Sequence, residues 1–254
     1  MILRRLGNKT KIAMDIQKYF PAHSIYIEPF FGAGGMFFNK PKAKYNIVND
    51  LDSDVFNLFQ VVSTKKDEFE KAFYEMPIHS DLLEYWKINK ETDPIRKALR
   101  FLLISNMTWM GIGDKIHTSL KNHKQPVFEL LNKTNKMIFD VQFSNTDFSK
   151  FLSGISFRCE EEIFKTFIYC DPPYLGTSDN YENSFTEDDS NRLFESLIDT
   201  KCKWAMSEFD HPFIIEKANN RKLNVIIIGD RKNLKNRRTE ILITNYENAP
   251  TLFS

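Results

Sequence analysis

The sequence is poor in cysteine, and its three cysteines lie far apart. Cys159, Cys170 and Cys202 show none of the short spacings with which cysteines hold a metal. An odd, sparse set is typical of reduced thiols, so it favours a cytoplasmic protein and excludes a disulfide scaffold. We expect no metal site.

Long apolar runs are missing as well. No stretch approaches the roughly 18 apolar residues that would cross a membrane, and the basic first residues are not followed by the apolar segment of a signal peptide. Repeats and low-complexity linkers are also absent. The sequence therefore predicts no membrane partner. Its 254 residues are enough for one large domain, or for one domain that carries an insertion.

A strong excess of one charge is lacking, because the formal net charge is only +1. The basic residues are nevertheless unevenly placed. Residues 221–238 hold seven Arg or Lys against one acid, and residues 4–11 hold four basic residues and no acid. Each segment could be a phosphate contact or an ordinary solvated patch, and the charge alone does not decide between them.

Short β-branched and aromatic runs predict a set of buried strands. They lie at 24–30, 45–50, 136–143, 165–171, 203–209, 224–230 and 240–246. Helical patterns at 11–20, 186–198 and 211–220 alternate with them, which predicts an α/β fold with a mostly parallel, Rossmann-like sheet. The last two strands are joined by a short loop, so we expect them to pair antiparallel.

Residues 51–135 interrupt this alternation with mainly helical patterns. We interpret them as a helix-rich insertion between the second and third strands. Residues 1–50 and 136–254 would then form the main domain.

A glycine-rich turn, "EPFFGAGGMF" (28–37), follows the first predicted strand. Gly32 and Gly34 allow a ligand to approach the backbone, although a plain turn is nearly as frequent. Asp50 at the tip of the next strand could accept hydrogen bonds from ribose hydroxyls, or it could cap a helix. The combination indicates an adenosine-containing ligand.

Two further strand ends carry polar or aromatic groups. In "NTDF" (145–148), the acid or the aromatic ring could reach an adenine, or the segment could form an Asx turn. "DPPY" (171–174) ends the fourth strand, because proline cannot continue a sheet ladder. Asp171 and the Pro172 carbonyl could hold the two hydrogens of an exocyclic amine, and Tyr174 could stack on a base. A bare D-P-P would favour an extended loop exit instead.

With its motifs in this order, the sequence resembles the Dam-type DNA N6-adenine methyltransferases over nearly the whole chain. "EPFFGAGGMF" resembles their cofactor motif and "DPPY" their catalytic motif. "RRLGNKTKI" resembles their basic N-terminal segment, and "NRRTEILITNY" (236–246) resembles the terminal segment beside the target base. The N-terminal segment has one glycine before Lys9 where the family usually has two. The recognition region differs from that of GATC-methylating members, so no GATC specificity follows.

The resemblance implies methyl transfer from S-adenosylmethionine, leaving S-adenosylhomocysteine, to a flipped-out adenine in double-stranded DNA, without a metal. It implies a bacterial or phage-infected cell, with a cognate restriction endonuclease encoded elsewhere as a candidate partner. Alternatives are an RNA or protein amino-methyltransferase with the same tetrapeptide, and a cofactor-binding protein without catalysis. The implied catalytic residues are Asp171, Pro172, Pro173 and Tyr174. The implied cofactor-binding residues are Arg5, Lys9, Glu28, Phe31, Gly32, Gly34, Asp50, Asp147, Phe148 and Asp171.

The DNA contacts are predicted in two places. Residues 105–124, "SNMTWMGIGDKIHTSLKNHK", have the glycines and basic residues of a base-reading loop, with an ordinary surface hairpin as the alternative. The basic segments at 4–11 and 231–238 would contact phosphates. The DNA-binding candidates are Met110, Lys115, Lys121, Arg231, Lys235 and Arg237.

Overall fold

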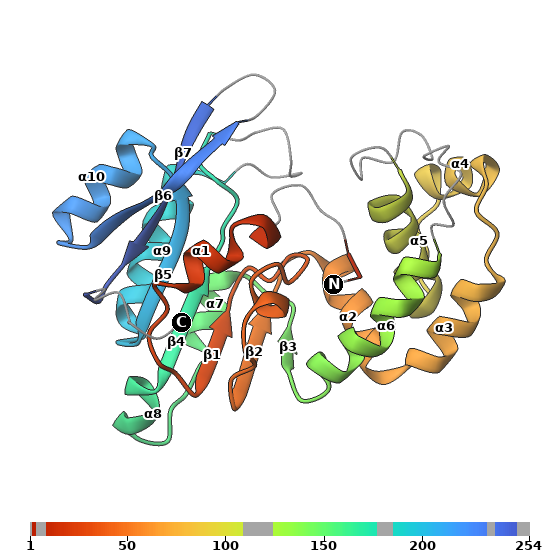
Figure 1. Cartoon of the computed structure of the whole chain (residues 1–254), viewed down its shortest axis with the longest axis horizontal. Coiled ribbons are helices and arrows are strands. Elements are labelled where there is room, and N and C mark those ends of the chain that lie inside the picture. Colours follow the sequence, from red (N-terminus) through yellow and green to blue (C-terminus); the bar gives the residue numbers. More distant parts are fainter. Residues whose placement is uncertain (1, 4–8, 109–123, 177–184, 233–236, 248–254) are drawn as a thin grey trace.

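The computed structural model describes residues 2–3, 9–108, 124–176, 185–232 and 237–247. Within these residues, seven strands form one sheet in the order β3-β2-β1-β4-β5-β7-β6 (Figure 1). The strands are β1 (Ile25–Glu28), β2 (Tyr45–Asn49), β3 (Gln142–Ser144), β4 (Thr166–Cys170), β5 (Lys203–Phe209), β6 (Asn224–Lys232) and β7 (Arg237–Thr244). All pairings from β3 to β5 are parallel.

The predicted antiparallel pairing of the last two strands is confirmed. β7 lies between β5 and β6 and runs antiparallel to both, so β6 forms the edge of the sheet. The central strands are covered on both faces, which is why they read as nearly continuous apolar runs. All five residues of β4 are buried.

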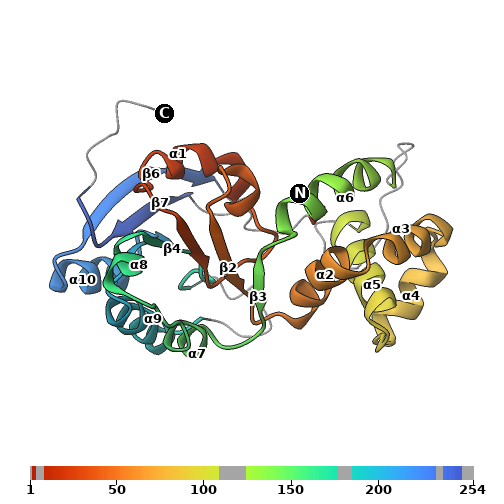
Figure 2. The same cartoon turned by 90° about the horizontal axis from the view of Figure 1, so that it is seen from below.

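Helices cover the two faces of the sheet unequally (Figure 2). The main domain contains η1 (Lys9–Lys11), α1 (Ala13–Gln17), η2 (Phe37–Asn39), α7 (Phe148–Ser153), α8 (Glu160–Phe164), α9 (Glu187–Asp199) and α10 (Pro212–Asn220). Helices α7, α9 and α10 pack on the face that presents Ile27, Ile168 and Trp204. Helix α1 packs on the opposite face. Thr186 begins α9 with a capping box, in which Asp189 returns a bond to the cap.

The region between β2 and β3 is helical, as predicted, and lies beyond β3 in Figure 1. It contains α2 (Ser53–Thr64), α3 (Lys66–Glu75), α4 (Ser80–Ile88), α5 (Pro94–Met107) and α6 (Gln125–Ile138). Side chains cap the first turns of three helices, namely Asp52 on α2, His79 on α4 and Asp93 on α5.

The third strand was predicted at 136–143, and most of that prediction is wrong. Residues 136–138 continue α6, and the strand begins only at Gln142. Val127, Leu131, Thr134 and Ile138 are the buried residues of α6. Their spacing is that of one helix face, so the apolar residue at 138 belongs to the helix and not to a strand. The predicted helix at 11–20 is also shorter, with η1 and α1 covering parts of residues 9–17.

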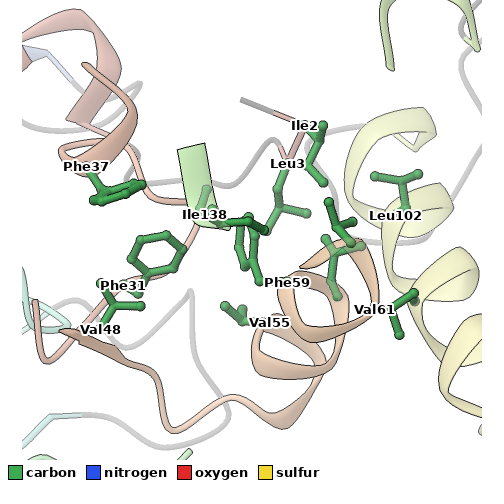
Figure 3. Packing of buried hydrophobic residues seen from close by; sticks show 14 of the residues in the cluster. Ile2, Leu3, Phe31, Phe37, Val48, Val55, Phe59, Val61, Leu102 and Ile138 are labelled. Atoms are coloured by element: carbon green, nitrogen blue, oxygen red, sulfur yellow. The ribbon is translucent and has the colours of Figure 1, made fainter. Parts of the chain in front are cut away.

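One apolar cluster joins the sheet to the helical region (Figure 3). Phe59 of α2 lies at its centre, with its ring centroid 5.0 Å from that of Phe31 and 5.9 Å from that of Phe143. Ile2 and Leu3 pack into the same cluster, and the Ile2 carbonyl accepts a hydrogen bond from Asn106 of α5. The helical region therefore shares its core with the sheet. The assignment of residues 51–135 to DNA recognition stays a prediction.

Candidate active site

The carboxyl ends of three adjacent parallel strands bring the predicted motifs to one edge of the sheet. β1 lies between β2 and β4 in register. Glu28 ends β1, Asp50 follows β2, and Asp171 follows β4. This edge is where ligands bind in open α/β sheets. Burial raises the pKa of Glu28 well above its usual range, and the nearby charges of Asp171 and Asp50 add to this rise.

The glycine turn after β1 needs glycine at two positions. Gly32 and Gly34 have φ angles of +53° and +71°, which other residues rarely adopt. A Cβ on Gly34 would lie 2.5 Å from the Phe38 ring, whereas a Cβ on Gly32 would meet nothing within 4 Å. The backbone at Gly32 therefore faces open space, and Gly34 packs against the core.

Asp50 holds this turn from the tip of β2. Its carboxylate accepts hydrogen bonds from the Gly32 amide at 2.5 Å and from the Asp52 amide at 2.9 Å. The cap of α2 is Asp52, so helix capping does not account for Asp50. The half-buried carboxylate lies beside the open side of the turn, where a ribose could reach it.

Phe31, predicted to bind the cofactor, points the other way. Its ring is buried in the cluster shared with α2, between the rings of Phe37 and Phe59. Its backbone amide bonds to the carbonyl of Asn49. The side chain thus anchors the turn, and a direct contact with a cofactor stays a prediction.

At the end of β3, Asp147 caps α7 by accepting bonds from the amides of Ser149 and Lys150. The sequence left an Asx turn open for this segment, and the bond from the Ser149 amide, two residues on, is of that kind. Arg192 of α9 lies 3.4 Å from the Asp147 carboxylate and covers the ring of Phe148. Phe148 packs on Phe30, with ring centroids 5.4 Å apart. A role of Asp147 and Phe148 at an adenine stays a prediction.

Lys9 and the catalytic tetrapeptide form the centre of the site. The Lys9 side chain is only 3% exposed, and its ammonium lies 2.7 Å from Asp171 Oδ1. It also lies 4.3 Å from the centre of the Tyr174 ring. Pro172 is buried and Pro173 is half-buried. Arg5, the other residue assigned to the N-terminal segment, lies outside the described residues.

Tyr174 is held on several sides. Its hydroxyl donates a hydrogen bond to Glu240 Oε1 at 2.7 Å, and the Phe209 ring meets it edge-on at 4.6 Å. Burial raises the pKa of Tyr174 well above its usual range, so the phenol stays protonated. With 8% of the residue exposed and Lys9 over the ring, little of the ring surface is accessible in this arrangement.

Two buried acids of the site were missed by the sequence reasoning. Glu240 of β7 and Glu208 of β5 are each 1% exposed. Burial raises the pKa of Glu208 to about 8. Each is an ionisable residue inside a predicted apolar strand, as in "TEILIT" and "AMSEF". Buried charges are rare outside functional or paired positions, so this pattern could have identified both acids from the sequence.

The basic hairpin lies at the same end of the sheet. Arg231 of β6 pairs with Arg238 of β7, and Arg237 pairs with Lys232. Arg238 donates a hydrogen bond to the carbonyl of Gly176, just beyond the tetrapeptide. Lys235 and the loop residues Met110, Lys115 and Lys121 lie outside the described residues.

Among the described residues, no helix is long and apolar enough to cross a membrane. No group of three or more His, Cys, Asp or Glu side chains is placed there to hold a metal ion.

The strand order, with its antiparallel β7, and the motifs at the strand ends define the class of protein as a Rossmann-like methyltransferase. A family model described as D12 class N6 adenine-specific DNA methyltransferase matches residues 6–240, and the chain belongs to this family. The family confirms the resemblance and the prediction of an adenine-specific DNA methyltransferase. An RNA or protein amino-methyltransferase is not favoured.

Known relatives agree with this assignment. The DNA adenine methylase of Escherichia coli (strain K12) is 25% identical, over 88% of this chain and 86% of that protein. The retron Ec67 DNA adenine methylase of Escherichia coli is 27% identical, over 85% of this chain and 76% of that protein. The N-terminal domain of human METTL16 in complex with SAH aligns with 94% of this chain and 67% of that chain. Its TM-score is 0.41 at 9% identity, which supports no further argument.

Proposed function

We propose that the chain transfers the methyl group of S-adenosylmethionine to N6 of a flipped-out adenine in double-stranded DNA. It would serve in a restriction-modification system or as an orphan or phage methylase. The observation that carries the proposal is the placement of Asp171 one strand away from the glycine turn, at the edge that also holds Asp50. An amine held by the tetrapeptide and a nucleoside held by the turn would then be neighbours.

The residues present fit S-adenosylmethionine. The open space at Gly32 lets a ligand approach the backbone, and the Asp50 carboxylate at its side suits ribose hydroxyls. Asp147 and Phe148 would lie on the adenine side and Lys9 on the side of the tetrapeptide, and the family resemblance gives Arg5 a contact with the cofactor as well. When bound, S-adenosylmethionine supplies an electrophilic methyl group on a positively charged sulfur.

Asp171 and the Pro172 carbonyl would orient the target amine. The nitrogen of an aminopurine is a poor nucleophile, because its lone pair is delocalised into the ring. Two acceptors that hold its hydrogens turn the lone pair outward. They also bind the nitrogen more strongly as it becomes positive, so they stabilise the transition state more than the ground state. Pro173 would stiffen the loop that carries them.

A base inside a duplex cannot reach this edge, so the adenine would be flipped out, as methyltransferases generally require. Tyr174 would stack on it after a shift of the ring or of Lys9, because Lys9 covers the ring in the structure. Arg231, Lys235 and Arg237 would contact phosphates, and Met110, Lys115 and Lys121 would read bases. The relatives are bacterial, so we place the protein in the cytoplasm of a bacterial or phage-infected cell. A cognate endonuclease encoded elsewhere would be its genetic partner.

The test is transfer of tritium from labelled S-adenosylmethionine to duplex DNA, RNA and protein, measured side by side. We expect label in duplex DNA only, on N6 of adenine. Label in RNA or protein without DNA labelling would refute the proposal. Sequencing of modified bases in host DNA after expression would then give the recognition site.

A further inference from the structure

Glu240 is a buried carboxylate near the end of the sequence, and it lies at the same edge of the sheet as Asp171. Because β7 runs antiparallel to β5, its first residues lie beside the last residues of β5, and Glu240 pairs with Phe209. The three residues that follow, Ile241, Leu242 and Ile243, are buried and apolar. A carboxylate in such a strand loses its hydration, which is costly unless partners replace the water.

Two partners meet the same oxygen of Glu240. Oε1 accepts the hydrogen bond of the Tyr174 hydroxyl at 2.7 Å and lies 3.3 Å from the Lys9 ammonium. Lys9 in turn lies 2.7 Å from Asp171 and over the Tyr174 ring. Glu240 is therefore the second anion of a buried ion cluster that includes Asp171, and it also orients Tyr174.

The charges of this cluster matter for the reaction. Lys9 and Asp171 alone would form a neutral pair, and a cation so close to Asp171 opposes the positive charge that grows on the attacking amine. With Glu240, the three groups carry a formal charge of −1. Glu208 lies close enough for the charges of Lys9 and Asp171 to affect its pKa. Burial is the main effect and raises this pKa to about 8, so Glu208 is mainly protonated at neutral pH and adds little charge to the cluster.

Stability alone is a poor explanation for this cluster. Buried ion pairs contribute little net stability, because the loss of hydration offsets much of the attraction. The three groups come from η1, the end of β4 and the start of β7, and they converge on the tetrapeptide.

We propose that Glu240 is a positioning residue for the transfer step. It holds Lys9 and Tyr174 around Asp171, and it leaves the buried cluster with net negative charge. This inference rests on the proposed function.

The first test is Glu240→Gln, assayed for kcat and for the KM of DNA and of S-adenosylmethionine. Glutamine keeps the shape and an acceptor for the Tyr174 hydroxyl but removes the charge. We expect kcat to fall by roughly 10-fold to 100-fold, about 1.4–2.7 kcal/mol, with both KM values nearly unchanged. Tyr174→Phe, which removes only the hydroxyl, should lower kcat less.

The second test separates charge from shape. The double variant Lys9→Gln/Glu240→Gln removes one positive and one negative charge. The cluster then keeps only the charge of Asp171, so its formal charge is −1, as in the wild type. At saturating cofactor, we expect the double variant to have a higher kcat than Glu240→Gln. A kcat of Glu240→Gln equal to wild type, or a double variant no faster than the single one, would overturn the inference. If Glu240→Gln does not fold, Glu240→Asp is measured in its place, because aspartate keeps the charge. A kcat of Glu240→Asp as low as that of Glu240→Ala would contradict the role of the charge.

Thr244→Val is the matched control for folding. Thr244 is fully buried on the same strand and the same face, and its hydroxyl donates to the Tyr246 carbonyl. The variant should lose stability and keep the wild-type kcat per folded molecule. An inactive wild type would refute the proposed function, whereas an active wild type with an unaffected Glu240→Gln would refute only this inference.

Discussion

Charge and apolar packing are distributed differently in the main domain and in its helical insertion. Among the described residues, the buried charged side chains are Lys9, Glu28, Lys40, Glu208 and Glu240, and all belong to the main domain. The buried polar residues of helices α2 to α6 are Ser105 and Thr134. The free-energy cost of removing charged side chains from water therefore falls on the main domain, which carries the candidate active site, and not on the insertion.

The insertion is stabilised mainly by its apolar core. Its ion pairs, such as Lys87 with Glu84 and Lys66 with Glu70, lie at the surface, where such pairs contribute about 0–1 kcal/mol. That core is continuous with one face of the sheet through Phe59 and Phe31. Apolar burial in the insertion can therefore offset the cost of buried charge at the strand ends. Five substitutions test this division between buried charge in the main domain and apolar packing in the insertion.

The largest effect on stability is expected in the apolar cluster that the sheet and the insertion share. Phe59→Ala should lower the free energy of unfolding by about 3–5 kcal/mol, because it removes a fully buried ring shared by both parts. Denaturant unfolding should still show one transition, at lower denaturant. Phe139→Ala, whose side chain is 78% exposed at the end of α6, is the control and should change little. Two separate transitions would show that the two parts do not share a core.

Asp171→Ala should nearly abolish methyl transfer and leave the fold intact. The loss of a charged acceptor in the transition state is worth roughly 3 kcal/mol, or more than 100-fold in rate. Asp171 follows a strand and is 21% exposed, so the protein should unfold near the wild-type temperature. Asp199→Ala, at the exposed end of α9, is the control. Near-normal turnover at saturating cofactor would disprove the mechanism.

Glu208→Gln should change how stability depends on pH. Because the folded pKa is about 8 and the ordinary value is 4.5, the native state binds more protons than the unfolded state between these values. The stability of the wild type should therefore fall as pH rises from 5 to 8, and the variant should lack about 3–4 kcal/mol of this fall. Unfolding curves across this range provide the measurement. Parallel curves for both proteins would show that Glu208 is not a buried neutral acid.

Asp50→Ala should weaken S-adenosylmethionine binding about 10-fold, since a hydrogen bond to a charged group is worth about 1.5 kcal/mol. Titration calorimetry on the purified variant measures this loss. Asp52→Ser, two residues away, keeps an oxygen that caps α2 and should bind as wild type does. Unchanged affinity in Asp50→Ala would mean that the residue only braces the glycine turn.

The smallest effect is expected at Asp93, whose side chain caps α5 through the amide of Arg96. Asp93→Ala should cost about 1 kcal/mol of stability without changing kcat, because the cap lies in the insertion. Thermal unfolding and turnover of the same sample would test this. A lowered kcat per folded molecule would mean that the first turn of α5 takes part in methyl transfer.

Local patterns were enough for much of the molecule. The strands at 203–209 and 224–230 were predicted from the sequence, because a run of β-branched and aromatic residues is a local signal of a buried strand. The third strand was misplaced, because a short apolar run fits a helix end and a strand equally well.

The glycine turn, the acid at the tip of β2 and the proline-stiffened tetrapeptide could be predicted from the sequence alone, because each depends on a few consecutive residues. Three features are known only from the folded chain, namely the contact of Lys9 with Asp171, the burial of the Phe31 ring and the place of Glu240 in the buried ion cluster. These contacts join segments that are far apart in the chain. They exist because parallel β1 and β4 bring their carboxyl ends to one edge, and antiparallel β7 returns its first residues to that edge.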